Sequence, residues 1–500
     1  MKSLTFVFGS ALCLIGCNGG SDSAEAPGTS APAVAATEAP ATHTANAVRE
    51  MVEALRRGGR TDGGFQRSWK PPSSSAVDPG PRAGTADAGS PFAKLTPPQL
   101  TAFNAGREDF IGAEAVEDGL GPTMNLDSCG GCHSHPTIGG TSPPVNPQVA
   151  FATLLGAANK RPSFITANGP VREARFVRNA DGSPDGGVHA LFTIAGRSDA
   201  VGCTVAQPDF EAHLARSNVI FRIPTPLFGA GLIESIADSE ILKNQARASE
   251  TKRSLGIRGR PNMLLSSNSI SGQPNKNGND GTAGRFGHKA QNKSLLIFSG
   301  EAYNVEMGIT NGAFPTERDE TEGCNELTMP NDDATLDAAS PVEALSSIER
   351  FTLFMRFLAP PTPSTTAPGG AESIARGREL FTSTGCALCH TPSLSTYNAA
   401  VGAMRYQSAN LYSDLLLHDM GKGLADGIQQ GQASGSEFRT APLWGLGQRL
   451  FFLHDGRTSG LRKAILEHYS EGSEANGVTM KFFLLADGSQ QDLLNFLRSL

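Results

Sequence analysis

The sequence predicts a mainly α-helical protein with two related folded units behind an extended N-terminal tether. Two observations predict the units: a Cys-x-x-Cys-His motif occurs at Cys129–His133 and again at Cys386–His390, and a similar amphipathic stretch precedes each. The tether is indicated by residues 18–91, which are rich in Ala, Pro, Ser, Thr and Gly and poor in large apolar residues. A chain of 500 residues, 39% of them hydrophobic, is long enough to bury the cores of two units.

The N-terminus has the parts of a bacterial lipoprotein signal, predicted over residues 1–17. Lys2 is its charged part, an apolar stretch runs from Leu4 to Ile15, and the sequence Leu-Ile-Gly-Cys ends at Cys17. Acylation of Cys17 would anchor the mature chain, and Asn18 in place of aspartate favours the outer membrane, facing the periplasm or the cell surface. An ordinary signal peptide cut nearby and an uncleaved anchor are the alternatives. No other segment approaches the ~20 apolar residues of a membrane span, so we expect membrane contact through the lipid alone.

Composition divides the rest of the chain. Residues 18–94 are predicted to be a flexible low-complexity linker, because they hold too few apolar side chains to offset the entropy of ordering. Residues 95–358 form the first predicted domain, which a loop-rich insertion enlarges, and residues 371–500 form the second. Pro and Gly at 359–370 mark a hinge.

The 42 basic and 49 acidic residues give a net charge of −7, which offers no basic surface for nucleic acid.

A glycine on an apolar helical stripe precedes both motifs. The stripes are Phe103, Gly106 and Phe110 in the first unit and Ile374, Gly377 and Phe381 in the second. A glycine at this place lets another helix cross closely. For the second stripe the predicted crossing partner is the last segment of the chain, with Leu493, Phe496, Leu497 and Leu500.

The spacing within the two motifs is that of covalent haem attachment. In Cys-x-x-Cys-His the two thiols add across the haem vinyl groups, and the adjacent histidine binds iron. A zinc site would need further Cys or His pairs nearby, which neither motif has. The chain is therefore predicted to carry two covalently bound haem c groups in two cytochrome c-like domains. The predicted attachment residues are Cys129, Cys132, Cys386 and Cys389, and the predicted iron ligands are His133 and His390.

The sixth iron position decides whether a haem transfers electrons or does chemistry. For the second haem the candidates are Met404, His418, Met420, His454, His468 and Met480. His468 is favoured because it continues the apolar helical stripe that begins at Leu461, and a helix-capping role before Gly472 is the alternative. For the first haem no downstream residue is an obvious partner, and an open position is what a peroxide or a substrate needs.

Two cysteines, Cys203 and Cys324, remain after the signal and the haem motifs are counted. In an oxidising compartment they would be expected to form a disulfide. Two unpaired thiols buried apart are the alternative.

Longer motifs accompany the haem motifs. They are Asp118–His133, Thr225–Glu234, Gly284–Thr310 and Asp414–Arg457, which includes Leu-His-Asp-Gly-Arg at its end. In these segments the chain resembles the bacterial di-haem oxidoreductases, also called thiol oxidoreductases. They are relatives of the di-haem cytochrome c peroxidases and of the methylamine dehydrogenase maturation enzyme.

The resemblance implies roles for single residues. In that superfamily the C-terminal haem ligand stands 14 residues after the histidine of a His-Asp-Gly element, and from His454 this position is His468, with Met420 the main rival. A glutamate near the N-terminal haem acts as acid and base, since cleaving a peroxide O–O bond requires moving a proton between its oxygens. Glu234 is the candidate by position, and a surface or helix-start carboxylate is the alternative reading.

Three further positions relate to the same family. His288 stands where relatives more often carry tryptophan, which weakens a catalytic interpretation. Many relatives have a calcium-loop-like segment, but here residues 267–272 lack the acidic ligands, so calcium is not supported. Trp444, in the Arg-Thr-x-Pro-Leu-Trp-Gly element expected beside the second haem, would relay electrons or simply pack the pocket.

Together these features predict an exported di-haem oxidoreductase. The second haem, with His390 and His468, would transfer electrons to an open first haem at His133 that reacts with peroxide or oxidises a substrate. The expected partners are a redox protein or a small oxidant such as peroxide. A pure electron-transfer cytochrome with both irons six-coordinate is the alternative, and a binding or assembly module with structural haem is a third hypothesis.

Overall fold

A computed structural model describes residues 70–124, 126–157, 159–189, 197–265, 275–316, 324 and 330–500. All of them belong to one compact unit, Ala54–Leu500. The predicted signal, most of the predicted linker and residues 267–272 lie outside the described residues.

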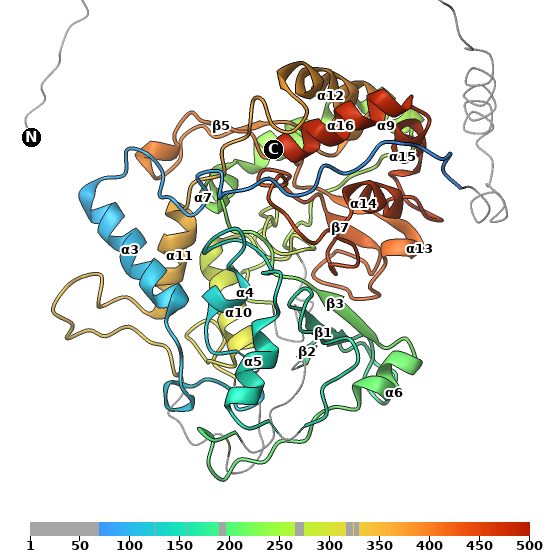
Figure 1. Ribbon diagram of the computed structural model, residues 1–500. Helices are drawn as coiled ribbons and strands as arrows, with labels where there is room; N and C mark the ends of the chain where they lie inside the picture. The colour runs from blue at the N-terminus through green and yellow to red at the C-terminus, as the bar shows by residue number, and fades with distance from the viewer. Residues whose placement is uncertain are drawn as a thin grey trace, which may run out of the picture. The chain divides into compact units, whose positions relative to one another are not determined.

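Helices are the main regular structure of the described residues, as predicted (Figure 1). In the N-terminal half the helices are α3 (Pro97–Ile111), α4 (Cys129–Cys132), α5 (Pro147–Leu154), α6 (Phe210–Ala215), α7 (Ala230–Ser235), α8 (Asp238–Ala246) and α9 (Ser249–Ser254). The later helices are α10 (Leu295–Met307), α11 (Ser347–Phe357), α12 (Ala371–Thr384), α13 (Gly421–Leu424), α14 (Leu461–Glu467), α15 (Asn476–Phe483) and α16 (Asp487–Ser499).

Short antiparallel strands accompany the helices. They are β1 (Glu173–Phe176), β2 (Val188–His189), β3 (Val219–Arg222), β4 (Leu394–Ser395), β5 (Ser408–Ala409), β6 (Leu417–Asp419) and β7 (Glu437–Arg439). The first three form a sheet in the order β2-β1-β3, and β4 pairs with β5 and β6 with β7. The three-stranded sheet lies in the predicted insertion, where Phe176 and Phe210 share a small separate core. The insertion is thus not made of loops alone.

The two predicted glycine crossings are both present. Before the first motif α3 crosses α11, and a Cβ on Gly106 would lie 2.1 Å from the carbonyl oxygen of Arg350. Before the second motif α12 crosses α16, as the C-terminal stripe predicts, and a Cβ on Gly377 would lie 2.1 Å from the carbonyl oxygen of Asp492. Figure 1 shows each pair side by side. The helices approach so closely because neither glycine has a side chain to hold them apart.

Residues 70–92, within the predicted linker, make specific contacts with the C-terminal unit. The guanidinium of Arg498, 1% exposed, donates two hydrogen bonds to Asp78, at 2.7 and 2.8 Å. Asp78 also accepts a hydrogen bond from the backbone N–H of Leu461, at the start of α14. Figure 1 shows this segment, in blue, passing beside α14 and α16. A buried arginine needs an acidic partner, which the segment supplies.

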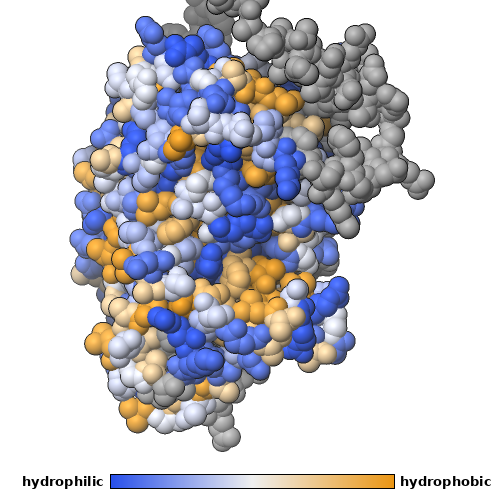
Figure 2. Space-filling view, turned by 45° about the vertical axis from the view of Figure 1, so that its right-hand side comes forward, coloured by the Kyte–Doolittle hydropathy of each residue, from blue (hydrophilic) through white to orange (hydrophobic). Residues whose placement is uncertain are grey.

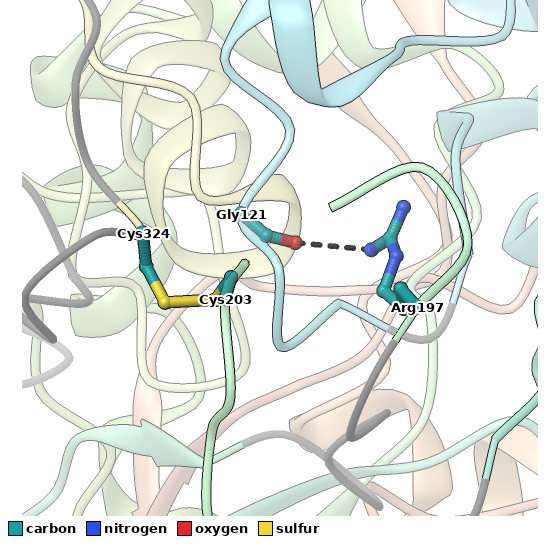
Figure 3. Close-up of a disulfide and its surroundings, with 4 residues drawn as sticks. All are labelled: Gly121, Arg197, Cys203 and Cys324. Carbon is teal, nitrogen blue, oxygen red and sulfur yellow. Dashed lines mark hydrogen bonds between the residues drawn. A yellow bond between two sulfur atoms is a disulfide. The ribbon is translucent and has the colours of Figure 1, made fainter. Parts of the chain in front are cut away.

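A disulfide joins Cys203 to Cys324, with 4.8 Å between their Cα atoms, as expected for an oxidising compartment. Close to it the buried guanidinium of Arg197 donates to the carbonyl oxygen of Gly121 at 3.2 Å (Figure 3). The same guanidinium donates to the carbonyl oxygen of Met124 at 3.1 Å. These contacts tie the insertion to the segment that precedes the first haem motif.

The face of the molecule in Figure 2 carries both hydrophilic and hydrophobic residues. Apolar residues form several patches separated by hydrophilic residues. No helix among the described residues is long and apolar enough to cross a membrane.

Candidate functional site

The first motif opens into a cavity of about 170 Å³. Cys129 and Cys132 stand at the two ends of α4, and both line the cavity with His133. The Nδ1 of His133 bonds to the carbonyl oxygen of Gly140 at 2.9 Å. Because a ring nitrogen that bonds a carbonyl carries the proton, Nε2 is the nitrogen available to a metal.

The second motif repeats this arrangement in a cavity of about 280 Å³. Gly385 ends α12 in the left-handed region, and Cys386 begins the turn that follows. Cys386, Cys389 and His390 all line the cavity. Here the Nδ1 of His390 bonds to the carbonyl oxygen of Tyr412 at 3.0 Å, which again leaves Nε2 for a metal.

The four motif cysteines are unpaired, in contrast to Cys203 and Cys324. Burial raises the pKa of Cys386 to about 12 and raises that of Cys129 further, so both are thiols rather than thiolates. A structural zinc site would need two further Cys or His ligands beside each pair of thiols. The described residues contain no group of three or more His, Cys, Asp or Glu arranged to hold a metal ion.

His468 lines the second cavity together with His390. It follows the last residue of α14, and its Nδ1 bonds to the carbonyl oxygen of Ala464 at 2.8 Å. Burial and then the nearby His468 lower the pKa of His390 to about 4, so His390 is neutral, as an iron ligand must be.

The other candidates for the sixth position differ in their surroundings. Met420 and His454 also line the second cavity, and the ring of His454 stacks on Phe438 at 4.3 Å. His418 lines it too, but its two nitrogens are bound by Asp414, at 3.0 Å, and Glu474, at 2.7 Å. Met404 and Met480 do not line the cavity. His468 and Met420, the two residues preferred from the sequence, thus both line the second cavity, and His454 lines it as well.

Two arginines show that the second cavity fits a haem. Arg439 and Arg449 line it, and no acidic residue is among its described lining residues. The buried Nε of Arg449 has no hydrogen-bond partner. Burial and the neighbouring Arg449 lower the pKa of Arg439 to about 10. Two cations this close need an anion, and the propionates of a haem would supply it inside an otherwise apolar cavity.

The first cavity has a charged wall. Besides the motif residues and apolar side chains, it is lined by Arg172, Arg175, Arg222, Glu173, Glu301 and Glu306. Glu173 bonds Arg175 at 2.8 Å, and the amide of Asn292 donates to Glu301. Glu306, near the end of α10, has no hydrogen-bonding partner among the described residues. The side chain of Glu306 is exposed at the cavity wall. Desolvation by the protein around it, and then the neighbouring carboxylate of Glu173, raise the pKa of Glu306 to about 8.

Glu234 does not line either cavity. Its carboxylate accepts a hydrogen bond from the Nε of Arg356 at 2.6 Å and one from the backbone N–H of Leu295 at 2.9 Å. These contacts hold the start of α10 against α11. An acid/base catalyst has to reach the reacting atoms, so this placement does not favour the role predicted for Glu234, which stays a prediction. The sequence signal that could have pointed to Glu306 is its place within the matching Gly284–Thr310 segment.

The two cavities adjoin. Both are lined by Thr225, Leu227, Gly287, His288 and Phe298. The Nε2 of His288 lies 3.1 Å from the carbonyl oxygen of Ile223, and its ring lies edge-on to that of His454 at 6.4 Å. Trp444 lines the second cavity, and its ring packs closely against Gly229. A Cβ on Gly229 would lie only 2.5 Å from that ring. The structure thus places His288 between the two sites.

Each of the two cavities has two free thiols and a histidine that a backbone carbonyl orients. This arrangement defines a protein that holds two haems. Residues 172–500 match the family model described as "Di-haem oxidoreductase, putative peroxidase". The chain belongs to this family, which confirms the resemblance seen in the sequence. The matched range begins after the first haem motif.

Other comparisons add little. No curated protein matches the chain. Among solved structures, xenon-pressurised hydrazine synthase from Kuenenia stuttgartiensis matches at 20% identity and a TM-score of 0.22. The match covers 32% of this chain and 56% of that one, and a TM-score this low supports no argument about fold.

Proposed function

We propose that the protein is an exported, lipid-anchored c-type di-haem oxidoreductase with peroxidase-type chemistry. Cys129 and Cys132 would hold the first haem, and Cys386 and Cys389 the second. The observation that carries this proposal is the repeated arrangement of unpaired thiols beside a histidine whose Nδ1 is bound by a backbone carbonyl, at 2.9 Å in His133 and 3.0 Å in His390.

The second haem would be the electron-transfer centre. His468 shares its cavity with His390, and two histidines on one iron give a low-spin haem with no position for a substrate. Arg439 and Arg449 would bind its propionates. No carboxylate is among the described residues that line this cavity, in contrast to the first cavity.

The first haem would be the reactive centre, with His133 as its proximal ligand. Haem iron supplies the electrons that reduce peroxide. Glu306 would take a proton from one peroxide oxygen and deliver it to the other, a task that needs a carboxylate with a pKa near the working pH. Its pKa of about 8 supports this role, as does the absence of a hydrogen bond to its carboxylate from the described residues. Arg172 and Arg222 on the same wall would stabilise negative charge during the reaction.

Electrons would pass between the haems through the wall that the cavities share. His288 lies in this wall and touches both cavities. Burial, and then the nearby Arg222, lower the pKa of His288, so its ring is neutral. A neutral imidazole adds no charge that would oppose electron transfer. The reductant at the surface would be a redox partner protein.

Electron paramagnetic resonance of the oxidised protein, with a peroxide titration, tests the proposal. A high-spin signal that changes with peroxide, beside a low-spin signal that does not, is expected. Two low-spin signals that peroxide leaves unchanged would instead indicate a pure electron-transfer cytochrome. Met124, Met307 and Met355 line the first cavity and are the methionines that could then complete its iron.

Cellular location has its own test. Metabolic labelling with a radioactive or clickable fatty acid should mark the wild-type chain and not Cys17→Ser. Labelling of both chains, or of neither, would contradict the lipid anchor without touching the haem proposal.

A further inference from the structure

Tyr303 is a buried phenol in the wall of the first cavity. It lies on α10 and is 4% exposed, and its ring meets that of Phe351 edge-on at 5.1 Å. Cys129 of the first haem motif lines the same cavity. A haem attached at Cys129 would therefore lie in the cavity that the tyrosine ring faces.

The hydroxyl of Tyr303 has a specific acceptor. It donates a hydrogen bond of 2.8 Å to Oε1 of Glu114, which lies in the loop after α3. The loop is held in place, because the backbone N–H of Glu114 donates to the carbonyl oxygen of Asp127 at 2.8 Å. Burial raises the pKa of Glu114 and also that of Tyr303. The phenol is thus protonated at rest, and its partner is a carboxylate with increased proton affinity.

Oxidation of a buried phenol requires a proton acceptor. A phenol that loses an electron becomes a strong acid, so the electron can leave readily only when the proton has somewhere to go. Glu114 is half-buried and within hydrogen-bond distance of the phenol. The proton of the peroxide is assigned to a different side chain, Glu306 on α10, so Glu114 is free to take the proton of Tyr303.

We propose that Tyr303 and Glu114 form a proton-coupled electron donor to the first haem, which stores one oxidising equivalent on the protein after reaction with peroxide. The inference rests on the proposed peroxidase chemistry. With a haem bound and oxidised by peroxide, Tyr303 would give up one electron, its O–H bond would break, and the proton would form an O–H bond at Oε1 of Glu114. The product is a neutral tyrosyl radical, and a one-electron donor reverses the step by returning an electron while the proton moves back.

A second tyrosine–glutamate pair in the chain serves as a matched control. The hydroxyl of Tyr397 donates to Glu240 at 3.3 Å, but Tyr397 is 46% exposed and does not line either cavity. The sequence has only five tyrosines, which simplifies assignment of a radical.

Freeze-quench electron paramagnetic resonance of the di-haem protein mixed with hydrogen peroxide tests the inference. The wild-type protein and Tyr397→Phe are expected to give a tyrosyl signal, and Tyr303→Phe is expected to lose it. Glu114→Gln keeps a hydrogen-bond acceptor but cannot take the proton, so its radical yield should fall several-fold, whereas Glu240→Gln should not change it. Haem content and the resting visible spectrum of each variant establish that it has folded.

The possible outcomes separate the two proposals. A haem signal that changes with peroxide while no tyrosyl signal forms, or a tyrosyl signal that survives in Tyr303→Phe, overturns the inference and leaves the proposed function standing. A haem signal that peroxide does not change overturns the proposed function, and the inference falls with it.

Discussion

The two cavities share one proximal design and differ in the rest of their walls. In each, two thiols and a histidine come from a Cys-x-x-Cys-His motif, and a backbone carbonyl orients the histidine. The first cavity adds three glutamates and three arginines from the insertion and from α10. The second adds apolar and aromatic side chains, further histidines and two arginines, with no acidic residue among its described lining.

The comparison shows how one binding motif can serve two purposes. Under the proposed function, the motif would attach a haem and supply the histidine that binds its iron. Whether that haem reacts depends on the opposite wall, where a reaction needs groups that move protons and an electron-transfer site needs a second strong ligand. Variants that alter one cavity, compared with control variants, therefore test this division between a reactive site and an electron-transfer site.

Loss of covalent attachment is the largest expected effect. The double variants Cys129→Ser/Cys132→Ser and Cys386→Ser/Cys389→Ser should each lose one of two covalently bound haems, because no thiol remains to add to the vinyl groups. Intact-mass spectrometry of the denatured protein would show the loss. Two haems retained in either variant would refute covalent attachment at that motif.

Removal of His468 is expected to change the second haem alone. His468→Ala should convert its low-spin signal to high spin, because the iron loses its sixth ligand, while the first haem keeps its spectrum. Electron paramagnetic resonance measures both. Met420→Ala is the matched control in the same cavity and should leave the low-spin signal intact. The reverse result would make Met420 the ligand.

Substitution of Glu306 is expected to slow the first haem's reaction. Glu306→Gln should lower the rate of reaction with peroxide about 100- to 10,000-fold, the range for loss of a general acid or base. As the base is the ionised form, the wild-type rate should rise with pH through the pKa of about 8, and the variant should lose this dependence. Stopped-flow spectroscopy checks both. Glu234→Gln, which loses its charge pairing with Arg356, should lower the melting temperature and leave the rate unchanged.

The smallest expected effect is a loss of stability at the two helix crossings. Gly377→Ala should destabilise the second unit by about 1–3 kcal/mol, since its new methyl group would press on the backbone of α16, and Gly106→Ala should act similarly on the first unit. Denaturant unfolding monitored in the haem absorption band measures both. Ser383→Ala, on the exposed side near the end of α12, should have no comparable effect. Equal stability of all three variants would show that the crossings tolerate a side chain.

Local sequence was informative where chemistry depends on neighbours in the chain. The haem motifs, the helix stripes and the crossing of α12 by α16 could be predicted, because spacing along a helix or a turn places these residues together. The position of His468 could be predicted from its helical stripe and from the resemblance, and it shares the cavity of His390.

Position along the chain could not show which partners Glu234 has. Position within a matching motif placed it near the first haem, but α7 directs its carboxylate to Arg356 instead. Likewise, composition assigned residues 70–92 to a flexible linker, and no local pattern revealed that Asp78 would bind Arg498, more than 400 residues away.

The sequence by itself determined that this protein carries two haem-binding motifs and belongs among di-haem oxidoreductases, since a haem is attached by residues that must be adjacent. Only the tertiary structure decided which side chains face each cavity. Glu306, Tyr303 and Arg449 stand far from their haem motifs in the chain, and packing alone brings them to the cavity walls. The proximal chemistry is local, but the environment opposite it is a property of the whole fold.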